Sequence, residues 1–512
     1  MKSKLTLLLL FLITINLNAQ DAFLTLNVEE DQPIISKHIY GHFSEHLGRC
    51  VYDGYWVDED MDVPKKDRIR LDVVDALKKI NIPNLRWPGG CFADEYHWRD
   101  GIGPRSERTS MVNTHWGMIV EDNSFGTHEF LELCELIGTE PYIAANVGSG
   151  TVEEMNDWIE YVNYNGESTL AKQRAENGHP EPYNVAFWGI GNESWGCGGN
   201  MTVEYFADVY KRYATYAKSY PGTQIKRIAS GANTTDYHWT EVMMQEAKRQ
   251  MWGLSVHYYT VPTGNWSKKG SATSFTEREY FETMKRGLFM NELLDKHIAI
   301  MDHYDPENRV ALVVDEWGIW TDSEPGSNSS FLYQQNSLRD ALIAGSILNI
   351  FNNRADRIRM ANLAQTVNVL QALILTNKEK MVLTPTYHVF DLYKVHQDAR
   401  LIPFLIKTPD YVRGEDKLPA VNVSASLDDA GKVHITLVNI DPNNPITISG
   451  ALNGFSWKTV TGRILTSKSV TDHNKFENPE VVKTATFNGA KKTKDGLTVE
   501  LPAKSVVMLE LN

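Results

Sequence analysis

Cysteine is scarce in this chain of 512 residues. Only four are present, and none forms a CxxC pair: Cys50, Cys91, Cys134 and Cys197. Small secreted domains that depend on disulfides are far richer in cysteine. The sequence therefore does not indicate a disulfide framework, although one bridge remains open.

Long apolar runs and basic tracts are also missing. Beyond the first residues, no segment offers the roughly 20 uninterrupted apolar residues that a membrane-spanning helix needs. The 51 basic and 65 acidic side chains give a formal net charge of −14. Such a charge disfavours contact with phosphate backbones, so we expect neither a membrane span nor a nucleic-acid partner.

The first 19 residues have the layout of a secretory signal. Lys2 and Lys4 precede an apolar run over residues 5–15, and residues 17–19 read Leu-Asn-Ala. The run is too short to span a bilayer. The sequence therefore predicts cleavage after Ala19 and export to the periplasm or the medium.

Short β-rich runs alternate with helical stretches through most of the chain. Helical patterns cover residues 68–80, 127–137 and 203–219, and Thr127 and Gly138 are the expected cap and stop of the second. Eight strands alternating with helices predict a (β/α)8 barrel, whose active site lies at the carboxyl ends of the strands. The eight runs are residues 38–43, 84–87, 141–147, 185–190, 226–230, 253–256, 310–314 and 357–361.

Beyond about residue 387 the pattern changes to alternating apolar and polar residues. Segments 432–440 and 496–511, separated by Asn, Asp, Pro and Gly, predict antiparallel strands, and the segment 22–28 is expected to add one more. The predicted fold class is therefore α/β, a barrel with an appended β-sandwich. Its divisions are a leader (1–19), an N-terminal strand segment (20–35), the catalytic barrel (36–386) and the sandwich (387–512).

Polar residues gather where the predicted barrel strands end. The run AFWGIGNESWG places Asn192 and Glu193 after strand four, and ALVVDEWGIW places Asp315 and Glu316 after strand seven. A buried carboxylate is costly unless it is paired or used. The other ends carry, in strand order, Glu45, the run RWPGGCFAD, Asn146, Asn233, the run His257-Tyr258-Tyr259, and Gln365.

Glu193 and Glu316 offer the two carboxylates that glycoside hydrolysis requires. One protonates the leaving oxygen while the other attacks the anomeric carbon, and in a retaining enzyme the two stand about 5–5.5 Å apart. Apolar neighbours such as Trp188 and Trp195 would favour the protonated form of Glu193. Each glutamate alone could instead brace a loop or form an ion pair. Asp315 is expected to turn the other way on its strand and to be structural.

Six motifs occur together, in order: EHLGR, RWPGGCFADEYHWRDGIGP, WGIGNESWGCGG, HYY, DEWGIW and MANLAQ. Over nearly the whole barrel they resemble glycoside hydrolase family 51, the α-L-arabinofuranosidases, and the appended β-domain fits. The resemblance implies that Glu193 is the general acid/base and Glu316 the nucleophile, with retention of configuration. It also implies sugar contacts from Glu45, Cys91, Asn192, Tyr259 and Gln365.

The same resemblance implies that His257 supports the acid/base and that Asn192 bonds the sugar 2-hydroxyl. Cys91 stands where some members carry Asn, and a thiol donates a weaker hydrogen bond than an amide. No metal or organic cofactor is expected, and a homo-oligomer is implied. We expect an exo-acting enzyme that removes terminal non-reducing α-L-arabinofuranosyl residues from plant-type arabinose-containing polysaccharides or oligosaccharides.

Other functions remain open at this stage. Related barrels with the same pair of glutamates cleave β-xylosides or β-glucans, so a retaining β-xylosidase or endo-β-glucanase is the nearest alternative. His42, Glu45 and His46 match H-x-x-E-H, a zinc-hydrolase pattern that requires a helix. A carbohydrate-binding decoy would be expected to lack one glutamate. Three tryptophans are candidates either for a sugar platform or for the core: Trp98, Trp317 and Trp320.

Overall fold

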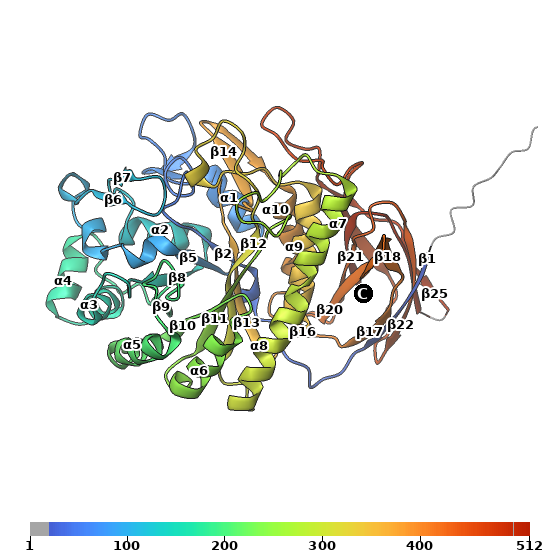
Figure 1. The fold of residues 1–512 in the computed structure, drawn as a ribbon, viewed down its shortest axis with the longest axis horizontal. Helices are drawn as coiled ribbons and strands as arrows, with labels where there is room; N and C mark the ends of the chain where they lie inside the picture. Colours follow the sequence, from blue (N-terminus) through green and yellow to red (C-terminus); the bar gives the residue numbers. More distant parts are fainter. Residues whose placement is uncertain (1–19, 495) are drawn as a thin grey trace, which may run out of the picture.

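The computed structural model of the protein describes residues 20–494 and 496–512. It consists of a (β/α)8 barrel beside a two-sheet β-sandwich (Figure 1), which confirms the predicted fold class. The expected leader, residues 1–19, lies outside the described residues. No helix of the described part combines the length and apolar character needed to cross a bilayer.

Eight parallel strands close the barrel in the order β10-β11-β12-β13-β2-β5-β8-β9, and each predicted run overlaps one of them. The first run differs at its start, because residues 37–40 form the 3-10 helix η1 (Lys37–Tyr40), in which Ser36 Oγ accepts the N–H of His38. The strands are β2 (Gly41–Phe43), β5 (Asn84–Trp87), β8 (Glu140–Ala145), β9 (Phe187–Ile190), β10 (Lys226–Asn233), β11 (Gly253–Thr260), β12 (Ala311–Ile319) and β13 (Ile358–Ala364).

Helices cover the outside of this barrel (Figure 1). The predicted helix over 127–137 is α2, and Gly138 ends it in the left-handed region at φ 79°. Thr127 is not its cap, because Gly126 holds that position and donates its N–H to Glu129. The helices are α1 (Leu71–Lys79), α2 (Thr127–Ile137), α3 (Val152–Asn163), α4 (Thr169–Glu176), α5 (Val203–Tyr216), α6 (Tyr237–Ala247), α7 (Glu277–Leu288), α8 (Met290–Tyr304), α9 (Leu338–Asn352) and α10 (Pro385–Tyr393).

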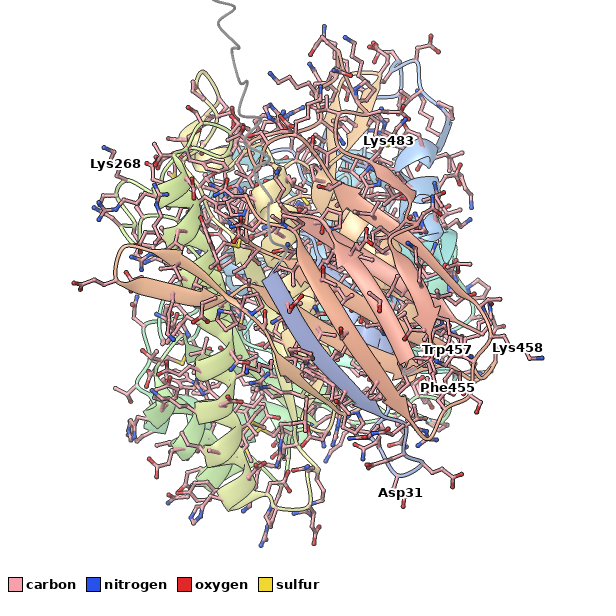
Figure 2. The ribbon with its side chains drawn as sticks, turned by 90° about the vertical axis from the view of Figure 1, so that its right-hand side faces the viewer. Asp31, Lys268, Phe455, Trp457, Lys458 and Lys483 are labelled. Carbon is pink, nitrogen blue, oxygen red and sulfur yellow. A yellow bond between two sulfur atoms is a disulfide. The ribbon has the colours of Figure 1, made fainter. Side chains whose placement is uncertain are left out.

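The β-sandwich has an inner sheet in the order β16-β20-β21-β27-β23-β24 and an outer sheet in the order β17-β1-β22-β26-β25. Figure 2 shows the outer sheet face on, with β1 in blue among strands from the other end of the chain and with Phe455 and Trp457 near one end. The strands are β1 (Gln20–Asn27), β16 (Arg400–Leu401), β17 (Phe404–Lys407), β20 (Val421–Leu427), β21 (Val433–Asn439), β22 (Ile446–Asn453), β23 (Val460–Thr466), β24 (Thr484–Thr486), β25 (Ala490–Thr493), β26 (Gly496–Leu501) and β27 (Ser505–Leu511).

Besides the hairpin of β3 (Lys65–Lys66) with β4 (Ile69–Arg70), two short hairpins extend from the barrel loops and one from the sandwich. Beside the cavity described below lies the hairpin β6 (Met111–Asn113) and β7 (Ile119–Glu121). The second is β14 (Ile374–Asn377) with β15 (Lys380–Leu383), and the third is β18 (Asp410–Arg413) with β19 (Asp416–Pro419). The first two follow β5 and β13, so they add to the rim at the carboxyl ends of the strands.

Helix α9 joins the barrel to the sandwich. All of its residues are buried, as expected for a helix that is covered on every side. Toward the inner sheet, Asn352 donates to Ser424 Oγ at 3.1 Å. Toward the barrel, Phe351 packs edge-on against Trp317 of β12, with ring centroids 5.3 Å apart. The sandwich therefore supports, through α9, the barrel strand that carries Glu316.

Candidate active site

A cavity of about 520 Å³ opens at the carboxyl ends of the barrel strands. The structure brings the predicted site residues together there, because all of them line the cavity except Asn192, which is buried and accepts a hydrogen bond from Arg86. They come from the ends of β2, β5, β9, β11, β12 and β13, so a site of this kind is assembled only when the barrel closes.

The two predicted carboxylates face each other in this cavity. Glu193 follows β9, Glu316 lies on β12, and one carboxylate oxygen of each lies within 4.8 Å of the other. Glu193 adopts the left-handed backbone conformation, with φ 41°. Such a conformation is costly for a residue with a side chain and is held by its surroundings.

The environment of Glu193 favours its protonated form. Burial raises the pKa of Glu193, a hydrogen bond from His257 partly opposes this, and the charge of Glu316 raises the pKa further. Oε1 lies 2.9 Å from His257 Nδ1, whereas Oε2 lies 3.6 Å from Cys197 Sγ. Oε1 thus faces a possible donor, whereas Oε2 faces the sulfur of a disulfide.

Arg86, at the third position of β5, brings a buried positive charge to the site. Its Nη1 donates to Glu316 Oε1 at 2.8 Å and its Nη2 donates to Asn192 Oδ1 at 2.7 Å. It was not among the residues predicted from the sequence, although a charged residue in the apolar run NLRW was a usable signal. Arg86 thus stabilises the charge on Glu316 and orients the amide of Asn192.

His257 bridges three carboxylates. Its Nδ1 faces Glu193, and its Nε2 lies 3.0 Å from Asp315 Oδ1. Burial disfavours the charged imidazole, but the carboxylates of Glu316, Asp315 and Glu193 outweigh it and raise the pKa of His257 to about 10. Burial also disfavours the charged form of Asp315 and would raise its pKa, but Arg86 and His257 outweigh burial and lower the pKa of Asp315 to about 2. The cluster is therefore a network of paired charges.

Asp315 and Glu316 both point into the barrel, contrary to the expectation that Asp315 turns away. Tyr142 on β8 donates to Asp315 Oδ2 at 2.7 Å, inside the barrel. The pairing with β11 shifts here: Ser255 pairs with Val313 but His257 pairs with Glu316, so β12 carries one extra residue. A β-bulge of this kind re-aims a side chain, and it places two consecutive acidic residues on one side.

Glu45 and Gln365 lie beside each other in the wall of the cavity. Glu45 accepts hydrogen bonds from the backbone N–H of Phe92 at 3.0 Å, from Trp116 Nε1 at 2.8 Å and from Gln365 Nε2 at 3.0 Å. Burial and then the charge of Glu316 raise the pKa of Glu45 to about 7. Gln365 Oε1 is buried without a partner, so it remains an acceptor for a ligand hydroxyl.

Cys91 lines the cavity in a form that the sequence analysis did not predict. Its sulfur is bonded to Cys197, so it has no thiol hydrogen to donate to a sugar. The bridge joins the loop after β5 to the loop after β9, beside the carboxylate of Glu193. Cys50 and Cys134 are free and buried. The sequence allowed for one disulfide bridge. It could not show which cysteines pair, because the two partners lie 106 residues apart.

Aromatic side chains form much of the rim. Trp116 on the β6–β7 hairpin, Trp195, Trp266 and Trp320 line the cavity, and Tyr259 OH donates to Glu316 Oε2 at 2.9 Å. Of the remaining predicted tryptophans, Trp98 and Trp317 belong to the core, and Trp188 packs edge-on against Trp158 away from the cavity. Trp116 was missed because it lies on a loop hairpin, where no strand end marks it.

The H-x-x-E-H pentad does not form a zinc site. His42 lies on β2 and packs against Phe390 with the two rings tilted by 55°, while His46 lies in the following loop and accepts from Trp87 Nε1 at 3.1 Å. The two imidazoles therefore do not share the helix face that the zinc reading requires. Glu193, His257 and Glu316 lie close enough to hold a cation, but Arg86 and His257 already supply positive charge there.

A (β/α)8 barrel with two facing glutamates at the ends of its fourth and seventh strands defines a glycoside hydrolase. The profile of the α-L-arabinofuranosidase 1 domain matches residues 76–284, and that of the α-L-arabinofuranosidase C-terminal domain matches residues 315–505. An intracellular exo-α-L-arabinofuranosidase of Bacteroides ovatus is 50% identical over 100% of both chains. The chain belongs to the α-L-arabinofuranosidases of glycoside hydrolase family 51.

Solved structures agree with this assignment. The family 51 arabinofuranosidase of Xanthomonas axonopodis pv. citri is 50% identical, with a TM-score of 0.95 over 96% of this chain and 100% of the other. The α-L-arabinofuranosidase of Thermotoga maritima, solved as an arabinose complex, is 33% identical, with a TM-score of 0.84 over 96% of this chain and 99% of the other.

The predicted export is corrected by the same comparison. The Bacteroides ovatus relative, which matches this chain from end to end at 50% identity, is described as intracellular. The export prediction used only two lysines and a short apolar run, which many sequences share. The barrel motifs fix specific residues in order, so they predict the fold more specifically.

Proposed function

We propose that this chain is an exo-acting, retaining α-L-arabinofuranosidase in which Glu193 is the general acid/base and Glu316 the nucleophile. One observation carries the proposal: the two carboxylates meet within 4.8 Å at the mouth of the barrel. Retaining enzymes hold their carboxyl groups about 5–5.5 Å apart, whereas inverting enzymes leave about 6.5–9.5 Å for a water molecule.

In the first step, Glu193 gives its proton to the glycosidic oxygen while Glu316 attacks the anomeric carbon. The carbon–oxygen bond to the leaving group breaks, and a glycosyl ester forms on Glu316. Arg86 and Tyr259 hold the two oxygens of Glu316 in place for this attack. In the second step, Glu193 takes a proton from water, which displaces Glu316 with a second inversion at the same carbon.

Groups without a full set of partners are available to the sugar. Among the described residues, Gln365 Oε1 has no partner and Asn192 Nδ2 has one, Cys197 Sγ at 3.8 Å, so an amide hydrogen is free for the 2-hydroxyl. Bonds to the 2-hydroxyl strengthen in the transition state of such reactions. With Cys91 oxidised, its contact with the sugar is through sulfur and is apolar.

The substrate class follows from the shape of the site and from the relatives. The cavity is a pocket closed by Glu45, Trp116 and Gln365, which suits a terminal sugar better than the middle of a polysaccharide. The Bacteroides ovatus relative is named an exo-α-L-arabinofuranosidase. We therefore assign terminal non-reducing α-L-arabinofuranosyl residues of plant-type polysaccharides or oligosaccharides as the substrate.

The experiment that tests this proposal compares aryl α-L-arabinofuranoside with the matching aryl β-xyloside. We expect fast release of the aryl alcohol from the arabinofuranoside and loss of that release in Glu316→Ala. Proton NMR of the first-formed sugar should show retention. Preference for the xyloside, turnover without Glu316, or an inverted first product would each contradict the proposal.

A further inference from the structure

Two buried side chains hold the backbone on either side of Glu193. The N–H of Asn192 donates to Asp94 Oδ2 at 3.0 Å, and the N–H of Ser194 donates to Ser230 Oγ at 3.1 Å. Both acceptors are almost fully buried, with 4% of Asp94 and 3% of Ser230 exposed. Neither side chain lines the cavity. The peptide groups that flank the acid/base are therefore fixed by groups that do not touch a substrate.

Asp94 also links Glu193 to a third loop. Its Oδ1 accepts the N–H of Val147 and the N–H of Gly148, each at 2.8 Å, in the loop after β8. Asp94 itself ends the 3-10 helix η2 (Cys91–Asp94), which follows β5. One carboxylate thus ties together the loops after three neighbouring barrel strands. Ser230 lies on β10, the neighbour of β9 on the other side.

The loop behind Glu193 is folded tightly against this support. A Cβ on Gly198 would meet Asn192 O at 1.8 Å and Asp94 Oδ2 at 2.7 Å, so the chain passes directly over both. The N–H groups of Gly196 and Gly198 both donate to the carbonyl of Glu193. The left-handed conformation of Glu193 is consequently held from its N-terminal side, its C-terminal side and its own carbonyl.

We propose that Asp94 and Ser230 are positioning residues for the acid/base: they hold the backbone of Asn192, Glu193 and Ser194 so that the carboxyl group of Glu193 reaches the glycosidic oxygen. This inference rests on the proposed function, because it assumes that Glu193 is the acid. Burial raises the pKa of Asp94 to about 7, while the three N–H groups favour its carboxylate.

Asp94→Asn tests this support with minimal change of shape. An amide has one oxygen and one NH2 group, so either the N–H of Asn192 or the pair from Val147 and Gly148 must face a donor. Ser230→Ala removes the other acceptor and leaves the N–H of Ser194 unsatisfied. Matched controls remove similar bonds far from the site. Asp305→Asn alters a buried carboxylate that accepts the N–H of Val310, and Ser168→Ala removes the acceptor for the N–H of Ala171.

The assay compares two substrates for each variant: an arabinofuranosyl oligosaccharide and an activated aryl α-L-arabinofuranoside, whose leaving group needs no proton. Displacement of a catalytic group by about 1 Å can cost on the order of 100-fold. We expect Asp94→Asn and Ser230→Ala to lose about tenfold or more in kcat/KM on the oligosaccharide and less than about threefold on the activated substrate. The controls should lose equally little on both.

Equal losses on both substrates, or no loss, in both site variants would overturn the inference and leave only a structural role. If Asp94→Asn does not fold, the ratio of the two losses in kcat/KM, oligosaccharide to activated substrate, is decided by Ser230→Ala alone. Glu193→Ala runs beside them. A Glu193→Ala variant that does not discriminate between the substrates would instead overturn the proposed function. If Glu193→Ala loses more on the oligosaccharide than on the activated substrate, but Asp94→Asn and Ser230→Ala lose equally on both, the positioning inference alone is overturned.

Discussion

The guanidinium of Arg86 lies 2.8 Å from Oε1 of Glu316, and both groups are buried. The same guanidinium donates to Asn192 with its other terminal nitrogen. A planar fork therefore spans the nucleophile and the amide beside the acid/base, and it fixes their separation. Lysine cannot reproduce that geometry, because it presents a single ammonium group at the end of a flexible chain.

Arg86→Lys should lower kcat/KM for an aryl arabinofuranoside by on the order of 100-fold or more, because one of the two contacts is lost. Steady-state kinetics at constant pH provide the measurement. Arg70→Lys is the control, since Arg70 is also buried but pairs with Asp72 and with backbone carbonyls outside the cavity. Activity of Arg86→Lys equal to that of the control would show that charge alone suffices.

Glu193→Ala and Glu316→Ala should separate by leaving group. Loss of the acid should reduce kcat/KM for oligosaccharides by about 10²–10⁴-fold and spare kcat/KM for activated aryl substrates, because kcat/KM reports the first step, in which a good leaving group departs without a proton. Loss of the nucleophile should abolish turnover of both kinds. Kinetics on a series of aryl arabinofuranosides give, for each variant, the slope of log kcat/KM against the pKa of the leaving group. Equal slopes for wild type and Glu193→Ala would count against the assigned acid.

His257 should make stability depend on pH at the alkaline side. Its pKa is about 10 in the folded protein, against 6.5 for an unperturbed imidazole, so the folded state binds the proton more tightly than the unfolded state does. The resulting stabilisation is complete below about pH 6.5 and is lost as pH rises through 10. The difference in the free energy of unfolding between wild type and His257→Gln should therefore shrink between these two values.

His297→Gln serves as the control for that pH series. Burial lowers the pKa of His297, so this histidine is neutral in both states above pH 6.5 and its contribution does not change there. Denaturant unfolding at several values of pH measures both differences. A constant difference for His257→Gln across the range would mean that the imidazole is neutral in the cluster.

Reduction of the Cys91–Cys197 bridge should destabilise the protein. The bond joins residues 106 positions apart, and closing a loop of that size contributes about 2–5 kcal/mol to the free energy of unfolding. Unfolding with and without a phosphine reductant measures the effect. A Cys50→Ala/Cys134→Ala variant should keep the full response, because those thiols are unpaired. The same unfolding midpoint in both conditions would show that the bridge adds no stability.

The barrel and its two glutamates were readable from the sequence because both depend on local pattern. Each strand is a short apolar run, and the residue after such a run must lie at the carboxyl end of the barrel. The inward turn of Asp315 was not readable, because it depends on a bulge that only pairing with β11 reveals. The Cys91–Cys197 pairing and the place of Trp116 depend likewise on how separate loops meet in space.

The position of strand β1 in the outer sheet determines when that sheet can form during synthesis. It is the first described segment to leave the ribosome, yet its neighbours β17 and β22 are made from residues 404–407 and 446–453. Until those residues emerge, its ladder groups have no partners, and a free edge of this kind invites pairing with other chains. The outer sheet therefore forms only after β17 and β22 have been made, and β1 stays unpaired until then.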